Sequence, residues 1–67
     1  MKFMKIRVHV GDVPIVDKVT DLTTKYVFPD EERTDTVYIG DGTEEDLETL
    51  RKNGWRVEFL EFLEAKP

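Results

Sequence analysis

The lack of any cysteine in a chain of only 67 residues is the feature that most restricts how this sequence can fold. A domain of this size buries only about 60% of the surface that its unfolded chain exposes, so small domains often add disulfides, metals or partner subunits. Disulfides and thiolate metal sites are excluded here, and the single histidine, His9, excludes sites built on paired imidazoles. We therefore expect one compact domain over residues 1–67, for which self-association as a homodimer remains an open route to further stability.

Apolar and charged residues alternate from Met4 to Val10, and this period of two predicts a half-buried strand. Gly11 and Asp12 then favour a turn, because glycine accepts positive φ angles at no steric cost. Residues 13–16 are either a separate short strand or part of the connection. If they form a strand, Pro14 restricts it to a sheet edge, because proline cannot donate a ladder hydrogen bond.

Residues 20–28 are rich in threonine, tyrosine, valine and phenylalanine, which favour strands, and we predict a strand there that ends at Pro29. The polar segment that follows reads as a loop, and residues 36–39 predict the returning strand of a hairpin.

Residues 43–54 carry the start and stop signals of a helix. Thr43 is a favourable N-cap, and Asp46 three residues later matches a capping box with a short acid. At the other end, Gly54 suits the left-handed residue of a Schellman motif, with Trp55 as its apolar partner. We predict a helix of about ten residues between these caps.

Trp55, Val57 and Phe59 alternate with charged residues and predict a final strand. The alternation slips after Phe59, so residues 60–66 either continue as a strand through a β-bulge or form a helical turn. This last strand and residues 36–39 are either parallel neighbours across a crossover, or non-adjacent or antiparallel. The sequence therefore predicts an α+β fold with a small, mostly antiparallel sheet of four strands, in the order β-β-β-α-β, packed against one helix.

The net charge of −5 is unevenly distributed. Residues 1–28 hold five basic and three acidic residues (net +2), whereas residues 29–67 hold five basic and twelve acidic ones (net −7). This acidic balance argues against direct nucleic-acid binding, and it leaves open that the protein is an acidic inhibitor that mimics nucleic acid. With no apolar stretch of membrane-spanning length and no signal-peptide pattern, we expect a cytoplasmic protein without membrane contact.

The segment from Val37 to Gly54 resembles the fourth motif of haloacid dehalogenase-like phosphatases, in which an apolar strand ends in Gly-Asp and a second acid follows. Gly40-Asp41 and Asp46 carry this resemblance, which implies that the two acids would hold Mg²⁺ at the end of the strand. The Asp-x-Asp nucleophile motif of that family has no counterpart after Met4–Val10. A metal- or phosphate-dependent enzyme fragment that uses Asp41 and Asp46 is therefore an alternative interpretation.

Seven aromatic residues are more than a single short helix can cover. Some must therefore lie elsewhere, and a contiguous exposed patch of such residues marks an interface. Our leading hypothesis is a non-catalytic binding or regulatory domain that acts through protein–protein contact, without a catalytic site, cofactor or metal. The candidate interface residues are Tyr26, Phe28, Tyr38, Phe59, Leu60, Phe62 and Leu63.

Overall fold

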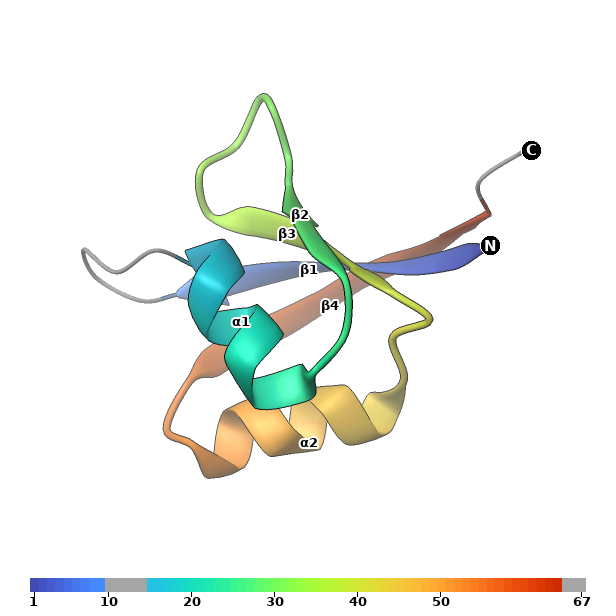
Figure 1. Ribbon diagram of the computed structural model, residues 1–67. Coiled ribbons are helices and arrows are strands. Elements are labelled where there is room, and N and C mark those ends of the chain that lie inside the picture. The colour runs from blue at the N-terminus through green and yellow to red at the C-terminus, as the bar shows by residue number, and fades with distance from the viewer. Residues whose placement is uncertain (10–14, 65–67) are drawn as a thin grey trace.

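Strands and helices follow one another in the order β-α-β-β-α-β in the computed structural model, which describes residues 1–9 and 15–64 (Figure 1). The elements are β1 (Lys2–His9), α1 (Ile15–Thr23), β2 (Val27–Pro29), β3 (Thr36–Gly40), α2 (Glu44–Lys52) and β4 (Arg56–Glu64).

The four strands form one sheet in the order β2-β3-β1-β4, and every neighbouring pair is antiparallel. Because β3 and β4 are both antiparallel to β1, they run parallel to each other without touching, so the non-adjacent alternative is the right one. This connectivity is that of the split β-α-β arrangement found in ferredoxin-like sandwiches. The predicted α+β class with a four-stranded antiparallel sheet is confirmed, and the predicted element order lacks one helix.

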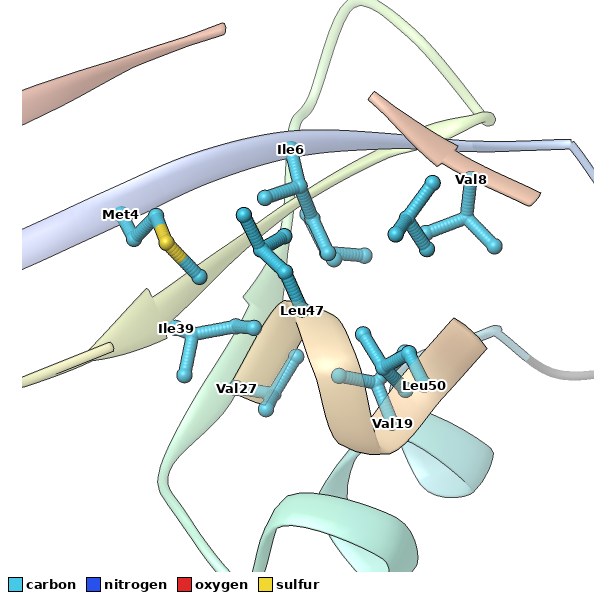
Figure 2. Close-up of a cluster of buried hydrophobic side chains, with 10 residues drawn as sticks. Met4, Ile6, Val8, Val19, Val27, Ile39, Leu47 and Leu50 are labelled. Atoms are coloured by element: carbon cyan, nitrogen blue, oxygen red, sulfur yellow. The ribbon is translucent and has the colours of Figure 1, made fainter. Parts of the chain in front are cut away.

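Both helices lie on the same side of the sheet, and the core fills the space between the two layers (Figures 1 and 2). Met4, Ile6 and Val8 point from β1 toward this layer and are at most 1% exposed. Leu50 from α2 and Val19 from α1 meet them and are fully buried (Figure 2). The core is therefore built from aliphatic side chains, and none of the seven aromatic residues is fully buried.

The predicted strand over residues 20–28 is wrong for residues 20–23, which belong to α1, Ile15–Thr23, and only Val27 and Phe28 of that segment lie in a strand. Intrinsic strand preference is overridden here by packing, since Val19 and Thr23 are both buried on the side of the helix that faces the core. The helix accommodates its threonines because their hydroxyls donate back one turn, as Thr23 does to the Val19 carbonyl at 2.7 Å.

The predicted hairpin is present but short, since only Val27–Pro29 pairs with β3. The optional strand over residues 13–16 is not formed at Ile15 and Val16, which begin α1, and residues 13 and 14 lie outside the described residues.

The caps predicted for α2 are confirmed. The Thr43 backbone N–H donates to the Asp46 carboxylate at 2.8 Å. The Asp46 backbone N–H donates in turn to the Thr43 carbonyl at 3.0 Å. At the C-terminus, Gly54 has a φ of 84°, and the Trp55 N–H donates to the Leu50 carbonyl at 3.1 Å, as in a Schellman motif.

A β-bulge at Leu60 explains why the alternation slips in β4. Lys5 pairs with Glu61 and Ile6 pairs with Phe59, so Leu60 is the extra residue of the longer strand. Of the two predicted alternatives for the tail, the strand is correct as far as Glu64.

Candidate functional site

The structure divides the candidate interface residues between the two faces of the sheet. Phe28 and Tyr38 pair across β2 and β3 on the face opposite α1 and α2, with Tyr26 beside them. Phe59 and Phe62 pair with Ile6 and Met4, and so lie on the helix side. Of the other two candidates, Leu63 lies opposite Phe3 and Leu60 occupies the bulge; both are half-buried.

Four rings on the uncovered face pack against one another, and we call Phe3, Tyr26, Phe28 and Tyr38 the open-face cluster. Phe28 is its centre: its ring stacks on Tyr38 at 4.8 Å, meets Phe3 edge-on at 5.2 Å and lies 5.7 Å from Tyr26. Only Tyr26, at the end of this group, is largely exposed, at 65%. Most of the aromatic surface of the cluster is therefore already used within the domain.

The Tyr38 hydroxyl of the open-face cluster is also paired. The Tyr38 hydroxyl donates to Asp30 Oδ2 at 2.8 Å, and Lys5 Nζ lies 3.8 Å from the same oxygen. The hydrogen bond to Asp30 raises the pKa of Tyr38, and burial adds to this effect. The pKa of Asp30 is lowered, chiefly because the Glu32 backbone N–H donates to its carboxylate and next because the Tyr38 hydroxyl does.

Phe59 and Phe62 have different surroundings, because they form one wall of a groove between β4 and α2. Their rings are 5.0 Å apart and their side chains are 42% and 43% exposed. The groove encloses about 360 Å³ and we call it the α2–β4 groove; its lining residues are Met4, Glu44, Leu47, Glu48, Arg51, Phe59 and Phe62.

The rim of the α2–β4 groove is acidic. Glu44 and Glu48 are both exposed on α2. The one basic residue of the lining, Arg51, donates to the Val57 carbonyl at 3.2 Å and lies 3.8 Å from Glu48, so its charge is already balanced locally. The groove thus combines an apolar floor with an acidic border.

β4 is also an edge strand, because the sheet order places it last. β1 occupies one of its sides, and no other strand among residues 1–9 and 15–64 pairs with the opposite side. Glu58 faces Arg7 and pairs with it at 3.2 Å, whereas neither Glu61 nor Glu64 makes an ion pair within the described parts of the chain.

Of the two acids singled out by the phosphatase resemblance, Asp46 has structural partners for its carboxylate. Asp46 is only 7% exposed, and besides capping α2 it accepts a hydrogen bond from Lys25 Nζ at 2.7 Å. The same ammonium group donates to the Asp41 carbonyl at 2.9 Å. Lys25 therefore connects the segment after α1 to the start of α2. Its ammonium group pairs with the Asp46 carboxylate, one of the two that the resemblance assigned to Mg²⁺.

Asp41 and Gly42 form a tight turn between β3 and α2. Asp41 has a positive φ of 54°, and its N–H donates to the Lys2 carbonyl at 2.8 Å. A Cβ on Gly42 would lie 2.8 Å from the Met4 Cβ, so only glycine fits there without a shift. In the part of the chain that the structure describes, no three His, Cys, Asp or Glu side chains are grouped closely enough to hold a metal ion.

Sequence reasoning identified Phe59 and Phe62 but missed the residues that complete their groove. Met4 was expected only as part of the first strand, and Glu44 and Leu47 lie within the predicted helix without any role assigned to them. The signal for their grouping was available in part, since Glu44, Leu47, Glu48 and Arg51 follow helical spacing along one face of α2. Their proximity to β4 depends on the sheet order.

Comparison of the chain with protein-family models, with curated proteins and with solved structures found no match. Neither of the two helices in the described residues has the length and apolar character that crossing a bilayer requires.

Proposed function

We propose that this domain is a non-catalytic protein-binding module that uses the α2–β4 groove. The observation that carries the proposal is the exposure of Phe59 and Phe62, at 42% and 43%, on an edge strand beside an apolar hollow. Covering such exposed side chains with a partner stabilises the complex, by about 25 cal/mol for each Å² of apolar surface removed from water. Buried aromatic anchors of this kind are typical centres of binding energy in interfaces.

The contrast with the open-face cluster supports the choice of this surface over the other. Phe28 and Tyr38 already contact further rings and a paired carboxylate, so a partner would gain less by covering them. Phe59 and Phe62 contact each other, and the Lys2 Nζ lies 4.3 Å from the Phe62 ring centroid.

Selection of ligands from a random peptide library against the full chain tests this proposal. The selected peptides should bind a Phe59→Ser, Phe62→Ser double variant about tenfold more weakly, or worse, because truncation of a central aromatic anchor costs about 2 kcal/mol or more. Tyr26→Ser, which truncates the most exposed ring of the open-face cluster, is the matched control and should bind as the unmodified chain does. Equal affinity for the double variant and the unmodified chain would refute binding at the groove.

A further inference from the structure

No strand among residues 1–9 and 15–64 pairs with the outer side of β4, an element of nine residues, although the Val57 carbonyl already accepts a hydrogen bond from Arg51. An exposed strand edge of this length is a template on which an extended segment can add as a further strand. The α2–β4 groove runs beside this edge, because Phe59 and Phe62 belong to both. A segment that pairs with β4 would therefore also place side chains against the groove.

The side chains of β1 show what kind of strand fits β4. Three glutamates of β4 have basic residues opposite them in the register: Arg7 opposite Glu58, Lys5 opposite Glu61 and Lys2 opposite Glu64. Apolar residues of β1 lie opposite the two phenylalanines, as Met4 does for Phe62. A strand on the outer side would face these same β4 side chains, of which Glu61 and Glu64 make no ion pair within the described residues.

We propose that β4 binds an extended segment of a partner protein in which basic and apolar residues alternate. The basic residues face Glu58 and Glu61 on the open side of the sheet, and the apolar residues lie over Phe59 and Phe62 and enter the groove. The acidic rim formed by Glu44 favours the same positive partner. The inference rests on the proposed function at this surface and specifies the class of partner.

Charge argues against a second copy of the chain as the occupant. A two-fold pairing of β4 with itself centred on Glu61 would place that residue against its own copy and bring Glu58 near Glu64. Like charges directly opposite one another destabilise a strand pair, and the chain as a whole carries −5. The bulge at Leu60 does not prevent strand addition, because β1 already passes it with a single shift of register.

Two synthetic peptides of the same length as β4 provide the test, one alternating lysine with valine and the other alternating glutamate with valine. The lysine peptide should bind the full chain and slow hydrogen exchange at those β4 amides that do not bond to β1, as measured by NMR. The glutamate peptide should bind at least about tenfold more weakly, because it would place its own carboxylates opposite the glutamates of β4. Methylation of alternate backbone nitrogens on the pairing edge of the lysine peptide should abolish binding, since it removes the donors of the ladder.

Charge variants of the protein separate a specific contact from general attraction. Glu61→Gln should weaken lysine-peptide binding about two- to fivefold, the range for an exposed ion pair, whereas Glu31→Gln, the same charge change in the loop between β2 and β3, should leave it unchanged.

Four results would overturn the inference: no binding of the lysine peptide, equal binding of both peptides, unchanged exchange in β4, or a dimer in sedimentation that requires Phe59 and Phe62. If library-selected peptides still lost affinity for the double variant in any of these cases, the proposed function at the groove would stand without the strand-addition mode.

Discussion

The open-face cluster and the Phe59–Phe62 pair contain similar residues but differ in what already surrounds them. Phe28 contacts three other rings, and the Tyr38 hydroxyl donates a hydrogen bond to Asp30, so both side chains already have partners within the domain. Phe59 and Phe62 contact each other at the margin of a groove and remain more than 40% exposed. The difference indicates that the first group stabilises the fold and that the second is available to a partner.

The largest expected effect separates the two groups by stability. Phe28→Ala should lower the free energy of unfolding by roughly 2–4 kcal/mol, because it removes half-buried apolar surface and three ring contacts at once. Urea denaturation followed by circular dichroism measures this change. A loss no greater than that caused by Phe59→Ala would contradict the structural role given to the open-face cluster.

Truncation in the groove should have a smaller effect on stability. Phe59→Ala and Phe62→Ala should each cost about 1 kcal/mol, because a large part of each side chain is in water before the change. The same denaturation measurement applies, with Leu50→Ala as the control for a fully buried residue, which should cost about 2–5 kcal/mol. Losses for the two phenylalanines that matched the Leu50 control would mean that they belong to the core.

A still smaller effect concerns Lys2, whose ammonium group approaches the Phe62 ring. Lys2→Gln should lower the unfolding free energy by about 0.5 kcal/mol, the value for a cation–π contact at an exposed site. Thermal unfolding at low ionic strength is the suitable measurement. The effect should disappear in a Phe62→Ala background, and its persistence there would show that Lys2 acts through another contact.

The last prediction concerns the protonation of the open-face cluster. Asp30→Asn should lower the pKa of Tyr38 toward its ordinary value, as followed by NMR titration of the Tyr38 ring, while Glu31→Gln should leave it nearly unchanged.

In the unmodified protein the hydrogen bond favours protonated Tyr38, so its contribution to stability is complete below the ordinary tyrosine pKa and is lost as pH rises through the raised one. Asp30 acts at the other end of the pH scale: its contribution is present above the ordinary aspartate pKa and is lost as pH falls through the lowered one. An unchanged Tyr38 titration in Asp30→Asn would contradict the assigned hydrogen bond.

Local chemistry explains which elements could be predicted. The caps of α2 depend on residues within a few positions of one another, so Thr43, Asp46 and Gly54 specify that helix almost by themselves. The strand signal of β1 is equally local, since alternation needs no knowledge of the partner strands.

α1 was missed because its threonines and valines favour strands in isolation. Its helical signal is the spacing of Val16, Val19 and Thr23, which lie three and four residues apart and so share one face of a helix. Burial of this face stabilises the helix in the folded domain. That contribution depends on α2 and β2 lying beside the helix, which no local pattern reveals.

The candidate site could be predicted only in part for a related reason. The number of aromatic residues predicts that some remain exposed, and Phe59 and Phe62 are two of those. Which face each ring occupies depends on the register of β4, and one bulge residue, Leu60, places both phenylalanines on the helix side. The groove itself requires α2 and β4 to lie next to each other, a property of the whole fold.

Intermolecular NOEs between a library-selected peptide and the ring protons of the bound domain identify the binding surface without any substitution. We expect contacts to Phe59 and Phe62 and to the Leu47 methyl groups that line the same groove. Contacts confined to Tyr26 and Phe28 would contradict binding at the α2–β4 groove, because they would place the partner on the opposite face of the sheet.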